Sequence, residues 1–209
     1  MTFERLAADA ARYYSGKFEQ HGPTARGVDW NSEQTQALRF DQLMRVADAD
    51  HEPFSINDYG CGYGALVDHL EARNLRFRYS GFDLSAPMID YARAHHSTDC
   101  RWTTDEGELQ VADYTVASGL LNVKQDADEK AWHEYCLRVI DKLAGLSSRG
   151  FAWNMLTSYS DADRMRPDLY YADPRELFDY CKRKHGRNVA LLHDYGLYEF
   201  TMIVRKDAS

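Results

Sequence analysis

The segment Asp58–Leu66 reads DYGCGYGAL and places three glycines within five residues, after an apolar-flanked run and before a segment with helical spacing. Gly60, Gly62 and Ala65 match the permissive glycine pattern of dinucleotide-binding loops, so the glycines alone do not choose between a bound ligand and a sharp turn. Asp58 stands two residues before the first glycine. A carboxylate fixed there repels a pyrophosphate and attracts a cationic group. The segment therefore favours a ligand with a positively charged part.

The elements around this segment are predicted from the spacing of apolar residues. We expect strands over residues 53–59, 77–83, 99–104, 112–118 and 150–157. Helices are expected over residues 2–16, 32–48, 64–73, from 86 onward with a proline in the first turn, 127–144 and 174–184. Strands that alternate with helices predict a parallel sheet with helices on both faces.

The last part of the chain departs from this alternation. The runs NVALLHDY and LYEFTMIVR lie on either side of Gly196 and are rich in β-branched and aromatic residues, which predicts an antiparallel hairpin. The expected fold is an α/β, doubly wound, mostly parallel sheet of seven strands, with N-terminal helices and a C-terminal antiparallel hairpin.

Length and composition favour a single domain. The 209 residues are 44% hydrophobic, and the sequence has no internal repeat or Gly/Ser-rich linker. We expect one domain over 1–209, with a helical cap at 1–50 and an α/β core at 51–209. No apolar run approaches the ~20 residues that cross a bilayer, and charges occupy the place of a signal peptide's apolar core. We therefore expect a cytoplasmic protein without a membrane partner.

Charge and cysteine spacing count against other classes of site. The net charge is -8, whereas nucleic-acid binding relies on a basic surface. The four cysteines form no CxxC pair and lie near no histidine at zinc-ligand spacing, so neither a metal site nor a disulfide framework is predicted.

The segment DYGCGYGAL resembles the first motif of the class I S-adenosylmethionine-dependent methyltransferases, and YSGFDLSAPMIDYAR at 79–93 resembles their second motif. The resemblance covers most of the chain. YSGKFEQHGPTARGVDW, DYTVASGLLNVK, LYYADPRELFDYCKR and LLHDYGLYEF are similar to a group of small bacterial methyltransferases whose small-molecule substrates are uncertain. It implies a Rossmann-like methyltransferase fold, S-adenosyl-L-methionine as cofactor, and methyl transfer to a hydroxyl, an amine or a similar nucleophile of a small molecule, by a monomer or homodimer.

The resemblance also implies a set of cofactor-binding residues. Asp83, at the end of the second strand, is expected to hold the ribose hydroxyls, with helix N-capping as the alternative role. An arginine of the cap is expected to form a bidentate fork with the methionine carboxylate, with ordinary packing or solvation as the alternative. The full set is Asp58, Gly60, Cys61, Gly62, Gly64, Asp83, Leu84, Met88, Thr104, Asp105, Ser118, Gly119, Tyr14, Trp30 and Arg39.

The acceptor side is predicted from aromatic residues and the hairpin. Candidates for the acceptor pocket are Tyr13, Tyr170, Tyr171, Asp194 and Tyr195. His193 is the candidate general base, because a histidine titrates near neutral pH and LLHDYG places it where an apolar strand ends. A turn or surface role is the alternative for His193.

Two other functions stay open at this point. A nicotinamide-dependent oxidoreductase is compatible with GCGYGA and Asp83, and a non-catalytic protein that binds S-adenosylmethionine is compatible with the fold. A DNA amino-methyltransferase is disfavoured, because ASGLLNV stands where a (D/N/S)PP(Y/F/W) motif is expected.

Overall fold

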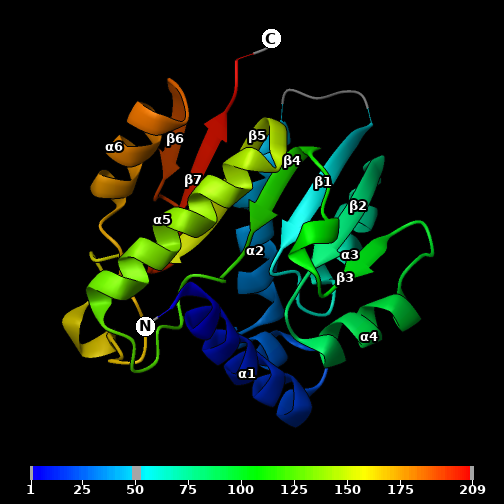
Figure 1. The fold of residues 1–209 in the computed structure, drawn as a ribbon, viewed down its shortest axis with the longest axis horizontal. Coiled ribbons are helices and arrows are strands. Elements are labelled where there is room, and N and C mark those ends of the chain that lie inside the picture. Colours follow the sequence, from blue (N-terminus) through cyan, green and yellow to red (C-terminus); the bar gives the residue numbers. More distant parts are fainter. Residues whose placement is uncertain (1, 49–52, 208–209) are drawn as a thin grey trace.

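Seven strands form one sheet in the order β3-β2-β1-β4-β5-β7-β6, drawn as a ribbon in Figure 1. The structure is a computed structural model that describes residues 2–48 and 53–207. The strands are β1 (Phe54–Tyr59), β2 (Phe77–Phe82), β3 (Arg101–Thr103), β4 (Ala112–Ala117), β5 (Ser147–Leu156), β6 (Asn188–Leu192) and β7 (Glu199–Arg205). β1 to β5 pair in parallel, and β7 is antiparallel to both β5 and β6. The predicted fold class, including the hairpin, is confirmed, whereas the predicted division between residues 50 and 51 lies outside the described residues.

Helices cover both faces of the sheet (Figure 1). They are α1 (Phe3–His21), α2 (Glu33–Met44), α3 (Ala65–Ala72), α4 (Ala86–His95), α5 (Glu129–Gly145) and α6 (Pro174–Lys184). Within the described ranges, no helix has the length and apolar character needed to cross a membrane.

Two hydrophobic cores lie on the two faces, because alternate strand residues point to opposite sides. Phe151 and Trp153 of β5 pack with α1, α5 and α6, whereas Ala152 between them packs with α2, α3 and α4. The strands are therefore buried on both faces, as expected for a parallel sheet between two helical layers.

α1 lies across the edge of the sheet at which the parallel strands end (Figure 1). It is longer than the predicted range 2–16, because Gly16 is accommodated inside the helix. The helix ends at His21 and is capped by Gly22, whose φ is 65° and whose N–H donates to the Phe18 carbonyl. Together with the turn Ala25–Val28 and α2, α1 forms a cap over the strand ends.

A buried ion pair joins the cap to the last strand. Arg39 of α2 donates from Nε and Nη2 to the two carboxylate oxygens of Glu199, with the Nε contact at 2.8 Å and the Nη2 contact at 2.6 Å. Arg39 is 6% exposed and Glu199 is 2% exposed. The guanidinium also lies 3.9 Å from the centre of the Trp30 ring. The pair thus fixes the position of α2 and Trp30 relative to β7.

Removing one partner of this pair is expected to destabilise the fold strongly. Glu199→Ala leaves a buried guanidinium without its counter-charge, so the free energy of unfolding should fall by about 3–5 kcal/mol. Urea denaturation measures this change. Asp179→Ala is the control, since it breaks the exposed Arg183–Asp179 pair and should cost only about 0.2–1 kcal/mol. Equal effects of the two substitutions would show that Glu199 does not anchor the cap.

Candidate active site

The glycine segment forms the turn between β1 and α3. Gly60 has a φ of 85° and Gly62 has a φ of 57°, a region that other residues rarely adopt. The backbone N–H groups of Gly60 and Cys61 donate to the Phe82 carbonyl at 2.8 and 3.0 Å. The turn is therefore tied to the end of β2, beside the second predicted motif.

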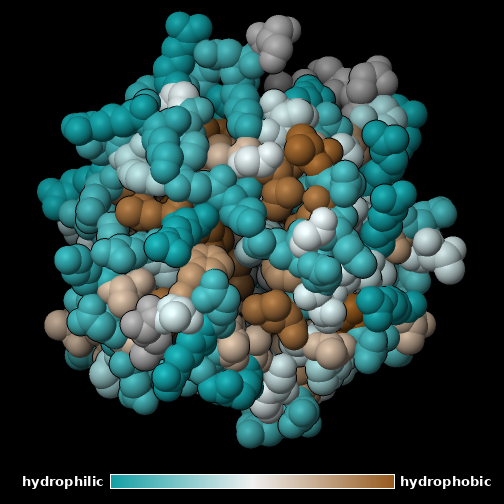
Figure 2. Space-filling view, viewed as in Figure 1, coloured by the Kyte–Doolittle hydropathy of each residue, from teal (hydrophilic) through white to brown (hydrophobic). Residues whose placement is uncertain are grey.

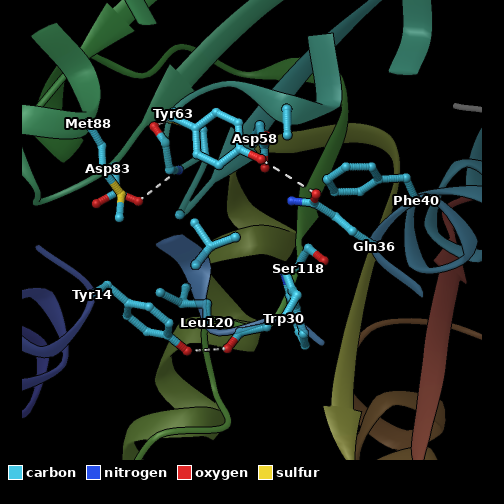
Figure 3. Close-up of a pocket in the computed structure, with 16 residues that line it drawn as sticks. Tyr14, Trp30, Gln36, Phe40, Asp58, Tyr63, Asp83, Met88, Ser118 and Leu120 are labelled. Carbon is cyan, nitrogen blue, oxygen red and sulfur yellow. Dashed lines mark hydrogen bonds between the residues drawn. The ribbon is translucent and has the colours of Figure 1, made fainter. Parts of the chain in front are cut away.

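Asp83 joins the two motifs. Its Oδ2 accepts from the Gly62 N–H at 2.9 Å (Figure 3). Its Oδ1 accepts from the Ser85 N–H at 2.8 Å. Burial raises the pKa of this carboxyl, while the two N–H donors oppose the shift. Each oxygen accepts one described hydrogen bond and keeps capacity for another. The carboxylate is therefore held in a fixed orientation with room to accept from a ligand.

Asp58 is a buried carboxyl beside the same turn. Its Oδ2 accepts from the Tyr79 hydroxyl at 2.7 Å. Burial raises the pKa of Asp58 to about 7, Tyr79 opposes this shift, and the neighbouring Asp83 adds to it. No cation pairs with Asp58 within residues 2–48 and 53–207. The site thus contains a buried acid whose ionisation a cationic ligand would favour.

The end of β4 supplies a third side of the site. Asn154 of β5 accepts from the Gly119 N–H at 2.8 Å and donates to the Ser118 hydroxyl at 3.2 Å. The Tyr14 hydroxyl of α1 donates to the Gly119 carbonyl at 3.0 Å. Trp30 packs so closely on Gly119 that a Cβ there would lie 2.2 Å from the ring. The cap and the β4 end therefore form one wall.

Three cavities meet along this edge. The central cavity is narrow and lies among Asp58, Gly60, Gly62, Asp83, Gln36, Ser118 and Gly119. Figure 3 shows Asp83 on one side of it, Gln36 and Asp58 on the other, and Tyr14 and Trp30 below.

The α1 cavity measures about 760 Å³ and lies between α1 and the ends of β1 and β2. Its wall includes Ala7, Ala11, Phe82, Asp83, Leu84, Glu106 and Tyr135. Hydrophobic atoms gather around a hollow near the middle of the face shown in Figure 2, the face on which α1 and α5 lie.

The outer cavity measures about 350 Å³ and lies between the cap, the end of β5 and the beginning of β7. Its wall includes Asp29, Trp30, Asn31, Asn122, Ser160, Arg164, Arg166, Tyr171 and Tyr198. It shares Tyr14, Val28 and Trp30 with the central cavity, and Tyr14 also lines the α1 cavity. Tyr14 therefore stands at the junction of the three cavities.

Most predicted cofactor residues line these cavities. Within the predicted set, the central cavity collects Asp58, Gly60, Cys61, Gly62, Asp83, Met88, Ser118, Gly119, Tyr14 and Trp30. Leu84 is exposed and lines the α1 cavity. Gly64 is the N-cap residue of α3, with a φ of 92°.

The strand after the second motif differs from the expectation in detail. Thr104 and Asp105 are exposed, and Asp105 Oδ1 accepts from the Gly107 N–H at 2.8 Å, which caps the short turn Glu106–Glu108. Glu106 lines the α1 cavity instead and accepts from the Tyr59 hydroxyl. The side chain that reaches the cavity is thus one position further along the chain than predicted.

Arg39 has a different partner from the one that the sequence analysis gave it. The bidentate edge of its guanidinium is taken by Glu199, so this fork is not open to a ligand carboxylate. Gln36, one helical turn earlier, is 7% exposed and lines the central cavity, and its Oε1 accepts from the Tyr63 hydroxyl at 3.5 Å. Its spacing of three residues from Arg39 was the signal that both occupy one helix face.

The predicted acceptor residues are only partly brought together. Tyr171 lines the outer cavity, and the Tyr13 hydroxyl donates to Asp29 of that cavity at 2.7 Å. Tyr170 contacts His133, with its hydroxyl 2.9 Å from Nδ1, and the Tyr195 hydroxyl lies 3.0 Å from Thr201 Oγ1.

The hairpin turn lies apart from the cavities. His193 and Asp194 are exposed and line none of the three cavities. The His193 ring lies beside Tyr159 and Phe200, with ring centres 6.0 and 6.3 Å apart. The β6 end faces the correct edge, but it is separated from β4 by two strands, β5 and β7, so His193 is not beside the site. Across the described chain, no group of side chains is arranged to hold a metal ion.

The chain was compared with known proteins by sequence and by fold. No family model matches the chain. It is 50% identical over 169 residues to the Putative methyltransferase Rv1506c of Mycobacterium tuberculosis, a match that covers 78% of this chain and 99% of that protein.

Solved structures show the same fold at low sequence identity. Magnesium protoporphyrin IX methyltransferase from Synechocystis PCC 6803, with SAH bound, has a TM-score of 0.61 at 15% identity, covering 96% of this chain and 94% of that one. Human N-acetylserotonin methyltransferase, in complex with SAM, has a TM-score of 0.55 at 15% identity, covering 99% and 67%. The plantazolicin methyltransferase BpumL, in complex with a desmethylPZN analog and SAH, has a TM-score of 0.60 at 12% identity, covering 98% of each chain.

The seven-stranded sheet and its flanking helices share the fold of these solved methyltransferases. With the 50% identical relative, the chain belongs to the S-adenosylmethionine-dependent methyltransferases. This membership sets aside the oxidoreductase and the non-catalytic protein that the sequence left open.

The buried Asp58 carboxyl predicts a pH effect on stability. Its pKa of about 7 in the folded state exceeds the ~3.9 of an unfolded aspartate, so the folded protein binds the extra proton between these values. The contribution of Asp58 to stability is therefore present at low pH and is lost as pH rises through about 7.

We expect Asp58→Asn to remove this loss. Relative to the natural protein, the variant should gain on the order of 3 kcal/mol in free energy of unfolding between about pH 4 and pH 7. Denaturation at a series of pH values measures the difference. Parallel pH profiles for the two proteins would show that Asp58 ionises freely.

Proposed function

We propose that this chain binds S-adenosylmethionine across the central and α1 cavities and transfers its methyl group to a hydroxyl or amine of a small molecule in the outer cavity. The observation that carries the proposal is the meeting of the three cavities at Tyr14. A donor in the first two cavities and an acceptor in the third would face each other there.

The residues present fit the cofactor. Asp83 would accept from the ribose hydroxyls, because backbone donors already orient both of its oxygens. Leu84 and Glu106 would lie beside the adenine in the α1 cavity. At the other end, Asp58 would attract the ammonium and sulfonium charges, and the Gln36 amide would donate to the carboxylate. When bound, the cofactor supplies a methyl group bonded to a sulfonium sulfur, and this sulfur is a good leaving group.

The protein's own contribution is then mainly geometric. Gly119 is held from both sides by Asn154 and Tyr14, and Trp30 covers it, so this wall is rigid where donor and acceptor would meet. The buried Arg39–Glu199 pair holds Trp30 in place from behind. Fixed walls of this kind convert a bimolecular displacement into an oriented one.

A hydroxyl acceptor also requires a base, and we assign this role to Asp29 instead of His193. Asp29 lines the outer cavity. Its Oδ1 lies 2.9 Å from Lys17 Nζ, and its Oδ2 accepts from Tyr13 at 2.7 Å. These partners keep the carboxylate in one position at the cavity wall, where it can receive the proton of an acceptor hydroxyl.

The proposal further treats residues 1–209 as one domain that acts on a small molecule and not on nucleic acid. The net charge of -8 supports the second point, because phosphate binding relies on a basic surface.

We expect Asp83→Ala to weaken cofactor binding. Loss of the ribose acceptor should cost about 1.5–3 kcal/mol, which corresponds to roughly ten- to hundredfold in dissociation constant. Isothermal titration calorimetry with S-adenosylmethionine measures it, with Asp90→Ala on the exposed side of α4 as control. An unchanged dissociation constant in a folded Asp83→Ala protein would rule out the ribose assignment.

Asp29→Asn tests the base. Asparagine tolerates the left-handed backbone of this position, where φ is 60°, so the fold should be kept. With an acceptor found by following S-adenosylhomocysteine release, turnover should fall by roughly 10²- to 10⁴-fold while cofactor affinity stays nearly unchanged. His193→Ala should retain full turnover. A loss of turnover in His193→Ala only would show that His193, and not Asp29, is the base.

A further inference from the structure

The outer cavity carries information about the acceptor, because the charges around it are already neutralised within the protein. The Arg39 guanidinium is paired with Glu199, and Asp29 is paired with Lys17 at 2.9 Å. Arg166 Nε donates to Asp168 Oδ1 at 3.1 Å, and its Nη2 donates to the other oxygen. Arg164 stands at the exposed rim, with Asp163 at 3.8 Å. A charged acceptor would therefore have to compete with existing ion pairs.

Neutral hydrogen-bonding groups remain open to the cavity. Asn122 is 5% exposed, and its Oδ1 accepts from the Leu156 N–H at 3.0 Å, which leaves the Nδ2 donors for a ligand. The Tyr171 hydroxyl accepts from the Arg166 N–H at 2.9 Å and keeps its own proton to donate. Neither donor has an acceptor among the described parts of the chain. Hydrogen-bond donors that are open to the cavity in this way favour a ligand that supplies oxygen atoms.

Ring faces complete the wall. Trp30, Tyr171 and Tyr198 line the cavity beside the aliphatic Leu156 and Val123. Aromatic faces pack on C–H groups, while amide and hydroxyl groups bind hydroxyls, so the wall offers both contacts to one molecule. The volume of about 350 Å³ lies at the lower end of the ~300–1,000 Å³ range of ligand cavities.

We infer that the outer cavity takes a neutral, polyhydroxylated acceptor of the class of a single sugar ring, with Asn122 and Tyr171 as the residues that select it. The inference rests on the proposed function. A sugar ring presents C–H faces to the aromatic residues and hydroxyl oxygens to the free donors, and it brings no charge that would disturb the ion pairs.

In the reaction that follows, the oxygen of one sugar hydroxyl forms the new bond to the methyl carbon as the sulfur–carbon bond breaks. The electron pair of that bond stays on sulfur, and the hydroxyl proton passes to Asp29. The products are a methyl ether and S-adenosylhomocysteine, and no oxidant or reductant is needed.

Matched probes test the class of acceptor. Saturation-transfer NMR on the full chain with S-adenosylhomocysteine compares the methyl glycosides of glucose, galactose, mannose and rhamnose with glucuronate, galacturonate and catechol. We expect at least one neutral glycoside to bind roughly tenfold or more tightly than its acidic counterpart and than catechol. Preference for a uronate would assign the site to anions through Arg164 and Arg166, and preference for catechol would assign it to phenols. Either preference, or no response to any glycoside, overturns the inference.

Tyr171→Phe identifies the donor. The variant should weaken binding of the preferred glycoside by about 3- to 10-fold, while Tyr159→Phe, at an exposed tyrosine outside the cavity lining, should not. Glycoside binding unchanged in Tyr171→Phe would remove Tyr171 from the recognition of the acceptor. Calorimetry with S-adenosylmethionine on the same proteins shows whether a negative result contradicts the proposed function or only the sugar assignment. Absence of cofactor binding contradicts the proposed function, whereas intact cofactor binding without a glycoside response contradicts only the sugar assignment.

Discussion

The carboxylate of Asp83 accepts one hydrogen bond from the turn after β1 and one from the beginning of α4, and the geometry of the site depends on this arrangement. The two turns leave neighbouring parallel strands at the same edge, where their backbone N–H groups have no sheet partner. Asp83 accepts from one N–H of each turn, so its orientation is set before any ligand arrives. Burial raises the pKa of its carboxyl. Asp58 lies one strand away and is also desolvated. Ionisation of these two buried carboxyls is unfavourable unless a cation binds beside them.

The cap is held in place by contacts between residues that are far apart in the chain. Tyr14 reaches Gly119, and Arg39 reaches Glu199, so α1 and α2 are fixed on the strand ends by side chains instead of by sheet pairing. A buried ion pair contributes little net stability compared with apolar packing, but it defines one position for its two partners. In this chain the defined position is that of Trp30, which lines both the central cavity and the outer cavity.

The sequence was sufficient for the fold and for most of the central cavity, because both depend on local patterns. The order of strands and helices follows from apolar spacing, and the glycine turn and Asp83 are motifs of a few residues. The acceptor side could not be obtained in this way. Asn154 and Gln36 were missed because the first reads as part of an apolar strand and the second as a surface helix residue, and each acquires its role only from a partner brought close by the fold. Arg39 was placed on the correct helix, but its partner Glu199 lies 160 residues away in the sequence. Residue spacing does not predict a contact between such distant positions. His193 was chosen for its chemistry and lies at the correct edge, and only the order of the strands shows that β5 and β7 separate it from β4.

The reversed direction of β7 has a practical meaning for handling the protein. β7 runs away from the edge of the sheet that carries the cavities. Its last residues therefore lie at the opposite edge of the sheet from α1 (Figure 1). Phe3 and Glu4, in the first turn of α1, line the α1 cavity itself. An affinity tag or an immobilising linker attached after β7 would therefore leave the cavities accessible, whereas the same group attached ahead of α1 would stand at their entrance and compete with whatever enters.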